Sequence, residues 1–587
     1  MFYLASDIIS LKDVTFSYKG SKRRALDGIT LNVKQGECVA VLGPTGAGKS
    51  TLACVMNGTA PRFMDGSLAG DVTVDGMVPA KVGTAQMASR VGLVFGDPDT
   101  QLFGMTVEED VAFGPANLGL GYESIMERVG KSIGDMRLSG LERRAPHRLS
   151  GGQKQATAIA GVYAMLPKIM VLDEPTSMLD PEGKARVFGI VRMLKEQLGV
   201  TVVLIEQEVD DILNLADRVF VMRSGKFVLS GTPREVFGRV EELRQAGVRV
   251  PQIVEFGTLI GAAETPFTIE EAISAVTPAS ADMGEVAAPA CDRTGADLAA
   301  APEAGRAAQA DPVVQAVDVE FTYPGGARAL DGVNLAVDRG DLVAIVGQNG
   351  AGKTTLTRHF NGLLRPSSGD IRVLGRSAQG VPTIELCRHV GYVFQNPDEQ
   401  LFCTSVQEEL KFGPTNIGAD PHVTSQRVEE ILGDIGLTKY REVWPKYLTK
   451  GERQRLALAS VVAMDPDVLI VDEPTTGLDW VESLQILDYL ERLRDEHKKT
   501  IIIITHDMNI VSLYAKRVVV MARGRVVGDG TPREIFSQPD LMELACLRRP
   551  PIADLSQALW GEVLLTPAEA AARLLAAKSQ AAGVCSE

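Results

Sequence analysis

Two glycine-rich stretches carry residues whose types and spacing indicate chemistry: GPTGAGKST at positions 43–51 and GQNGAGKTT at positions 347–355. Each follows a short apolar run and precedes a segment of helical character. Backbone N–H groups of such a loop surround phosphate oxygens, the lysine reaches the β- and γ-phosphates, and the next hydroxyl ligates Mg²⁺. We therefore predict two ATP-binding loops, one in each half of the chain. The residues assigned to them are Gly43, Pro44, Thr45, Gly46, Ala47, Gly48, Lys49, Ser50, Thr51, Gly347, Gln348, Asn349, Gly350, Ala351, Gly352, Lys353, Thr354 and Thr355.

Each half also contains a strand-like run that ends in two carboxylates, Asp173 with Glu174 and Asp472 with Glu473. The aspartate is predicted to hold Mg²⁺ through its hydration shell, and the glutamate to polarise the water that attacks the γ-phosphate. Taken together, the predicted magnesium ligands are Ser50, Asp173, Thr354, Asp472 and Gln395. The predicted catalytic residues are Glu473, His506, Gln395 and Glu174.

Other candidate residues follow or precede strand-like runs. Gln395, in VFQNPDEQLF, is placed to sense the γ-phosphate. His506 follows the run 501–504, at the carboxyl end of a predicted parallel strand, where such folds place their ligands. Tyr18 and Tyr323 precede the two loops and are candidates for stacking on adenine, although core packing explains Tyr323 almost equally well.

The segment LSGGQ at positions 149–153 indicates a second kind of phosphate site. Ser150, Gly151, Gly152 and Gln153 open a predicted helix, and helix N-termini bind anions. A half that already has a phosphate loop does not need this helix for the same nucleotide. We therefore predict that it serves the ATP of the other half.

Composition excludes several classes of function. The 587 residues carry a net charge of −15, which argues against nucleic acid as a partner. The seven cysteines are scattered without a C-x-x-C pair, which argues against zinc and disulfides and fits a reducing cytoplasm. The sequence shows no signal peptide and no apolar run approaching about 18 residues, so a membrane role is expected to need a partner rather than direct insertion.

An internal repeat sets the predicted domain plan. Lys49 and Lys353 lie 304 positions apart, whereas Asp173 and Asp472 lie 299 apart, and the first half has its five extra residues between the phosphate loop and position 95. In each half, short β-branched runs alternate with helical patterns, which predicts two α/β domains with buried parallel strands. The predicted parts are a first nucleotide domain at 1–240, its extension at 241–275, a flexible Ala- and Pro-rich linker at 276–311, a second nucleotide domain at 312–540 and its extension at 541–578.

The combined motifs resemble those of the ABC ATPases over nearly the whole chain. The resemblance implies two tandem P-loop NTPase domains of the ABC type, each with a helical subdomain that carries the signature segment. It also implies a head-to-tail sandwich that binds two ATP molecules with Mg²⁺, each between the phosphate loop of one half and the signature of the other. ATP hydrolysis would then drive transmembrane transport.

A narrower resemblance rests on VFGDPDTQLFGMTVEEDVAFGPANLGLG and VFQNPDEQLFCTSVQEELKFGPTNIGA. These segments are similar to those of energy-coupling factor transporter ATPases, in which they grip a membrane T-component. The resemblance implies a peripheral protein at the cytoplasmic face of the cell membrane, one copy per transporter, with a separate substrate-binding membrane subunit. The cargo would be a vitamin, a vitamin precursor or a metal ion. The alternatives are an ABC ATPase with an ordinary permease, and a non-transport tandem ABC protein.

Three positions depart from the family pattern. Gly96 and Gln207 replace, in the first half, the residues that match Gln395 and His506, and Lys450 replaces the first glycine of the second signature, LTKGE. In the implied sandwich all three departures fall in the composite site built on the first phosphate loop. We call this site one and the site built on the second phosphate loop site two. The pattern predicts that site one holds ATP and turns over slowly, whereas site two is hydrolytic; the alternative is that both sites turn over.

Overall fold

The computed structural model describes residues 7–21, 23–276 and 312–584. The predicted linker at 276–311 lies outside this range, apart from Val276. Within the chain, Met1–Pro251 and Thr475–Gln485 form one compact unit, whereas Gln252–Pro474 and Ile486–Glu587 form a second.

The first unit is built on a six-stranded sheet in the order β5-β6-β7-β3-β8-β9. All neighbouring strands are parallel except β8 and β9, which are antiparallel. The strands are β3 (Cys38–Leu42), β5 (Val91–Val94), β6 (Ile169–Asp173), β7 (Thr201–Ile205), β8 (Arg218–Arg223) and β9 (Lys226–Gly231). Every residue of β3, β6 and β7 is buried, as expected for parallel strands covered on both faces.

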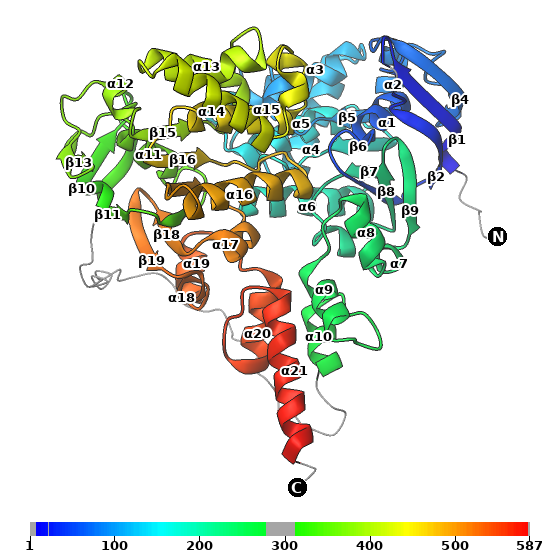
Figure 1. The fold of residues 1–587 in the computed structure, drawn as a ribbon. Helices are drawn as coiled ribbons and strands as arrows, with labels where there is room; N and C mark the ends of the chain where they lie inside the picture. Colours follow the sequence, from blue (N-terminus) through cyan, green and yellow to red (C-terminus); the bar gives the residue numbers. More distant parts are fainter. Residues whose placement is uncertain (1–6, 22, 277–311, 585–587) are drawn as a thin grey trace. The chain divides into compact units, whose positions relative to one another are not determined.

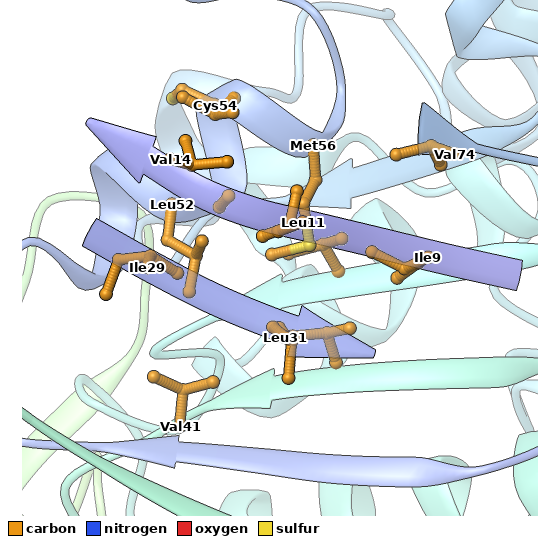
Figure 2. Close-up of a cluster of buried hydrophobic side chains, with 14 of the residues drawn as sticks. Ile9, Leu11, Val14, Ile29, Leu31, Val41, Leu52, Cys54, Met56 and Val74 are labelled. Carbon is orange, nitrogen blue, oxygen red and sulfur yellow. The ribbon is translucent and has the colours of Figure 1, made fainter. Parts of the chain in front are cut away.

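A smaller antiparallel sheet covers one side of the first unit, in the order β2-β1-β4. Its strands are β1 (Asp7–Tyr18), β2 (Leu26–Lys34) and β4 (Gly66–Val74). Ile9, Leu11 and Leu31 of this sheet lie in one apolar cluster with Val41 of β3 and Leu52 of helix α1 (Figure 2). This core fixes the phosphate loop, because the loop joins β3 to α1.

In the first unit, helices α3, α4 and α5 pack against one another, and α5 also packs on α6. Helices and 3₁₀ turns in this unit are α1 (Lys49–Met56), α2 (Thr84–Ala88), η1 (Pro98–Thr100), α3 (Val107–Asn117), α4 (Tyr122–Asp135), η2 (Pro146–Arg148), α5 (Gly151–Tyr163), α6 (Pro181–Glu196), η3 (Ile212–Asn214), α7 (Pro233–Phe237) and α8 (Val240–Ala246). The signature segment therefore opens a helix, α5, as its sequence predicts.

The second unit repeats the same plan with a six-stranded sheet in the order β15-β16-β17-β12-β18-β19 and a four-stranded sheet in the order β11-β10-β13-β14. The strands are β10 (Pro312–Thr322), β11 (Arg328–Asp338), β12 (Leu342–Val346), β13 (Ser368–Val373), β14 (Arg376–Ser377), β15 (Val390–Val393), β16 (Val468–Asp472), β17 (Thr500–Ile504), β18 (Arg517–Ala522) and β19 (Arg525–Gly530). The α/β class predicted from the β-branched runs is confirmed in both halves.

The helices of the second half follow the same order along the chain. They are α11 (Lys353–Phe360), α12 (Thr383–Leu386), η4 (Pro397–Glu399), α13 (Val406–Asn416), α14 (Pro421–Asp434), η5 (Thr438–Tyr440), η6 (Pro445–Tyr447), α15 (Lys450–Val462), α16 (Trp480–Asp495), α17 (Met508–Tyr514), α18 (Pro532–Phe536) and α19 (Pro539–Leu544). Helix α13 packs on α14 and α15, the same relationship as α3 with α4 and α5.

The C-terminal segments of the two halves share one apolar core inside the second unit. The segments are α9 (Gln252–Leu259) and α10 (Ile269–Val276) from the first half, and α20 (Pro551–Trp560) and α21 (Pro567–Val584) from the second. Phe256 and Ile552 are fully buried in this cluster. The buried Gln252 amide donates to Asn509 Oδ1 at 3.1 Å and accepts from the Ile552 N–H at 3.1 Å. Figure 1 shows these four helices side by side.

Within the described residues, no helix has the length and apolar character needed to cross a membrane.

Candidate nucleotide sites

The first phosphate loop owes its shape to glycines where side chains would not fit. Gly43 has φ 145°, and a Cβ there would lie 2.2 Å from the Met222 carbonyl oxygen. Gly48, at φ 110°, caps α1. Inside the loop, Lys49 Nζ donates to the carbonyl oxygens of Gly43 at 2.7 Å and Pro44 at 3.1 Å. The buried ammonium group is therefore held at the centre of the loop, where the predicted phosphates would lie.

The second loop repeats this geometry. Gly347 has φ 146° and Gly352, which caps α11, has φ 101°. Lys353 Nζ donates to the carbonyl oxygens of Gly347 at 2.7 Å and Gln348 at 3.1 Å. Both sequence-predicted loops therefore form the expected strand, loop and helix, and both lysines point inward.

The aspartates at the ends of β6 and β16 lie next to the hydroxyl that follows each lysine. In the second half, Asp472 Oδ2 accepts from Thr354 Oγ1 at 2.9 Å and from the Tyr392 hydroxyl at 2.8 Å. Burial raises the pKa of the Asp472 carboxyl, and these two hydrogen bonds oppose the rise. Position 93, which corresponds to Tyr392, is Leu in the first half, so no such phenol is available there.

In the first half, burial raises the pKa of the Asp173 carboxyl to about 6, and a hydrogen bond with Ser50 opposes the rise. Asp173 Oδ1 is buried and has no hydrogen-bond partner among the described residues. A buried carboxylate oxygen of this kind beside a serine hydroxyl fits a hard cation such as Mg²⁺. The described residues contain no cluster of three or more His, Cys, Asp or Glu side chains in a metal-binding arrangement, so other ligands would have to come from phosphate and water.

The glutamates that follow these aspartates adopt left-handed backbone conformations, with φ 51° at Glu174 and φ 48° at Glu473. Non-glycine residues rarely adopt this conformation, and it concentrates at functional sites. The Gln207 amide donates to Glu174 Oε1 at 2.8 Å, and the His506 ring Nδ1 lies 2.9 Å from Glu473 Oε1. The structure thus pairs each candidate base with the residue that the sequence places after the neighbouring strand.

The loops after β5 and β15 differ between the halves. Gln395 is exposed in the loop after β15. At the matching position, a Cβ on Gly96 would lie 2.7 Å from the Glu174 carbonyl oxygen and 3.0 Å from Ser177 Oγ. The backbone of the first half therefore approaches too closely at position 96 for a glutamine side chain to be added without a shift.

Both signature segments begin their helices with a capping box. In the first half, Ser150 Oγ accepts from the Gln153 N–H at 3.3 Å, and Gln153 Oε1 accepts from the Ser150 N–H at 3.1 Å. Thr449 and Glu452 form the same pair at the start of α15. Helix α5 therefore has the well-formed N-terminus on which the predicted phosphate contact depends, with Gly151 and Gly152 in its first turn.

The loop before α16 is part of the first compact unit although it comes from the second half. Asp479 Oδ2 accepts a 2.9 Å hydrogen bond from the backbone N–H of Thr45, and Asp479 Oδ1 accepts from the Glu482 N–H at 2.8 Å. A carboxylate of the second half thus contacts the N–H of a predicted ATP-binding residue of the first.

The tyrosines proposed for adenine stacking make a contact that the sequence did not indicate. The Tyr18 hydroxyl shares a 2.9 Å hydrogen bond with Thr51 Oγ1, and the Tyr323 hydroxyl shares one of 3.1 Å with Thr355 Oγ1. Both rings remain partly exposed, at 38%. Stacking on adenine stays a prediction.

Comparison with known proteins identifies the family. The family model described as ABC transporter matches residues 26–177 and 330–476. A protein of Caldanaerobacter subterraneus subsp. tengcongensis, provisionally named an ABC transporter ATP-binding protein, is 40% identical over 571 residues, covering 96% of this chain and 98% of its own. This chain belongs to the ABC transporter family.

Other similar proteins include an ABC transporter ATP-binding protein, also provisionally named, from Methanosarcina acetivorans. It is 40% identical over 547 residues, covering 92% of this chain and 89% of its own. Among solved structures, cbiO1 from Clostridium perfringens, described as part of the ABC transporter complex cbiONQ, is 37% identical. That structure covers 42% of this chain and 99% of its own, with a TM-score of 0.37. Family membership makes this chain an ATP-binding ABC ATPase.

Two residues beside the ABC ATPase sites are absent from the sequence-based assignment. Tyr392 binds Asp472 from the adjacent strand β15. Glu206, directly before Gln207, is 1% exposed and binds the loop that follows Glu174. The only sequence signal was a charged residue directly after the fully buried strand β7, at the position where the second half has Thr505.

Proposed function

We propose that this ABC ATPase powers an energy-coupling factor importer as a peripheral subunit on the cytoplasmic face of the cell membrane. Its partners would be a membrane T-component and a separate substrate-binding membrane subunit, with one copy of the chain per transporter. The observation that carries the proposal is a pair of matched, exposed aromatic contacts in the two segments that resemble this class of transporter.

The aromatic contacts have the same geometry in both halves. The ring centroids of Phe103 and Phe113 lie 4.4 Å apart in an edge-to-face arrangement, and the two residues are 62% and 51% exposed. The ring centroids of Phe402 and Phe412 lie 4.7 Å apart in the same arrangement, and these residues are 62% and 43% exposed. Exposed apolar side chains gathered in this way favour a protein-binding surface. Their recurrence at matching positions favours a partner with two similar docking elements.

Buried carboxylates hold the loops that present these rings. Asp110 Oδ1 accepts from the backbone N–H groups of Phe103 and Gly104, both at 3.0 Å. Glu409 Oε2 accepts from Phe402 N–H at 3.0 Å and Cys403 N–H at 2.8 Å. The loops are therefore ordered before a partner arrives, which lowers the entropic cost of binding.

A cavity of about 460 Å³ lies beside the first aromatic pair. Phe103, Phe113 and Met165 line it together with residues of β5 and α5. Its apolar lining suits the hydrophobic face of a short helix from a membrane partner. Gln101 lines the cavity, and its side-chain oxygen accepts from the Phe95 N–H at 2.8 Å, so partner binding there would be linked to the position of the neighbouring Gly96 beside Glu174.

The proposed chemistry divides the work between two composite sites. Each ATP would lie between one phosphate loop and the opposite signature, with Mg²⁺ held by Ser50 and Asp173 or by Thr354 and Asp472. Glu473, with His506, would orient the attacking water of site two. Glu174, with Gln207, would do so less effectively in site one, because glutamine carries no positive charge that could stabilise the transition state.

Purification of the tagged full-length chain from solubilised membranes of its native host tests the partner assignment. We expect two integral membrane proteins to co-purify with it in a fixed ratio, and F103A/F402A to abolish their recovery while ATP binding is retained. V228A, which truncates another exposed apolar side chain, is the matched control. Recovery of a permease pair without a separate substrate-binding subunit would support an ordinary ABC transporter instead, and recovery of no membrane protein would favour a non-transport role.

A further inference from the structure

Glu206 is a buried acidic residue that the proposed chemistry does not use. Its side chain is 1% exposed and lies directly after β7, the strand next to β6. Burial of a carboxyl group is costly unless hydrogen bonds satisfy its oxygens. The hydrogen bonds that satisfy this buried carboxyl therefore indicate its structural role.

Three hydrogen bonds join the Glu206 carboxyl to two loops. Oε1 accepts from the Thr176 backbone N–H at 3.1 Å and from the Thr176 hydroxyl at 2.7 Å. Oε2 accepts from the Gln207 backbone N–H at 3.1 Å. Thr176 lies two residues after Glu174, and Gln207 donates its side-chain amide to Glu174. The carboxyl thus fixes the backbone on both sides of the Glu174–Gln207 hydrogen bond.

The second half has a different residue at this position. Thr505 stands where Glu206 stands, and its hydroxyl accepts from the Asp507 N–H at 3.1 Å. A threonine cannot accept from three donors through two separate oxygens. The buried carboxyl therefore occurs in the first half, where Gln207 stands at the position of His506.

We infer that Glu206 is a positioning residue of the first nucleotide site, which clamps the loop after β6 to the loop after β7 and thereby orients Glu174 and Gln207. The inference rests on the proposed role of Glu174 as the residue that orients water. Glu206 itself would touch neither nucleotide nor water. It compensates for the missing histidine by restricting the glutamine amide to one orientation, since misplacement of a reacting group by about 1 Å can cost 10²-fold in rate.

Protonation should loosen this clamp. The charged groups that act on the Glu206 carboxyl are Glu174 and Glu208, and burial is the largest influence, raising its pKa to about 7. When one oxygen carries a proton, it becomes a donor and no longer accepts as a carboxylate oxygen does. Turnover at the first site should therefore fall as the pH drops below about 7, in addition to other pH effects shared by all variants.

Single-turnover ATP hydrolysis by the full-length chain, with site two silenced by Glu473→Gln, tests the inference. Glu206→Ala should lower the rate about 10- to 100-fold with little change in the half-saturating ATP concentration. Glu206→Gln keeps an acceptor for Thr176 but places a donor opposite the Gln207 N–H, as protonation does, so its rate should match that of the parent at low pH and lack the component of the pH profile near pH 7. Glu206→Thr, which installs the residue of the second half, should resemble Glu206→Ala.

Two results would overturn the inference. One is a Glu206→Ala rate within twofold of the parent, and the other is a Glu206→Gln variant as slow as Glu206→Ala with an unchanged pH profile. Thermal unfolding of each variant separates a slow enzyme from an unfolded one, and Glu206→Gln preserves the packing if the alanine variant does not fold. Glu174→Gln in the same background is the control: an unchanged rate there would refute the proposed role of Glu174, whereas a lower rate there with an unchanged Glu206→Ala rate would refute the positioning role of Glu206 alone.

Discussion

The side-chain amide of Gln207 donates a 2.8 Å hydrogen bond to Glu174, at the place where His506 contacts Glu473 in the second half. The two candidate bases therefore have the same geometry and different chemistry. An imidazole can carry an extra proton and a positive charge, whereas a glutamine amide stays neutral and can only form hydrogen bonds. Several consequences of this difference can be measured.

The two glutamates should contribute unequally to turnover. Loss of a base or positioning group typically costs about 10²–10⁴ in rate. Glu473→Gln should therefore nearly abolish steady-state phosphate release, whereas Glu174→Gln should leave a substantial fraction. Because closure can couple the two sites, the decisive measurement is the ADP yield of each trapped site in a single turnover. Equal yields from both sites would exclude the asymmetry.

Replacing Gln207 by His should accelerate the first site, because it restores a group able to compensate γ-phosphate charge. We expect an increase of about tenfold when Glu473→Gln silences site two. Gly96→Gln should not add to this gain, since its Cβ would lie 2.7 Å from the Glu174 carbonyl oxygen. Single-turnover rates of the two variants distinguish these effects, and a gain from Gly96→Gln would show that the loop tolerates the side chain.

Both phosphate loops should bind nucleotide. Lys49→Ala and Lys353→Ala should each weaken ATP binding by about 1.5–3 kcal/mol, because each removes a charge-assisted contact. Titration calorimetry of the parent chain should find two nucleotides per molecule, and each variant should retain one tight site. A single site in the parent would contradict the proposed arrangement.

Stability should depend on pH through Glu206. Its pKa is raised from 4.5 to about 7, so between these values the folded chain holds a proton that the unfolded chain has released. Stability is therefore lost as the pH rises through this window. Glu206→Gln should show a higher Tm relative to the parent at pH 8 than at pH 5. Glu196→Gln, at the exposed end of α6, is the control, and parallel Tm curves for Glu206→Gln and the parent would contradict the prediction.

The phosphate loops, the paired carboxylates and the buried strands could be predicted because their signals are contiguous in sequence. The hydrogen bonds of Glu206 could not, because Thr176 lies 30 residues away and meets it only when β6 and β7 are adjacent. Tyr392 and Asp472 are likewise 80 residues apart and come together through the pairing of β15 with β16. The restriction at Gly96 depends on the path of another loop, which no local pattern encodes.

The hydroxyl contacts of Tyr18 and Tyr323 also join residues that are far apart in sequence. Their distance from the loops along the sequence was compatible with stacking or with packing, and the structure adds a hydroxyl contact to the helix after each loop. A tyrosine held at both its ring and its hydroxyl has few accessible rotamers. Phe16 and Phe321 contact these rings edge to face at 5.1 and 4.9 Å, which reinforces the orientation.

Segments of each half of the chain fold with the other half, and we therefore expect the two halves to stay together without the peptide linker. Helices α9 and α10 belong to a core completed by α20 and α21, and Thr475–Gln485 folds with the first unit. If a protease site were introduced within residues 277–311, the two fragments should still elute as one particle after cleavage, as a heterodimer of separate gene products would. Phe256→Ala, which removes a fully buried ring from that core, should let the cleaved fragments separate more readily than the matched truncation of the exposed Leu259.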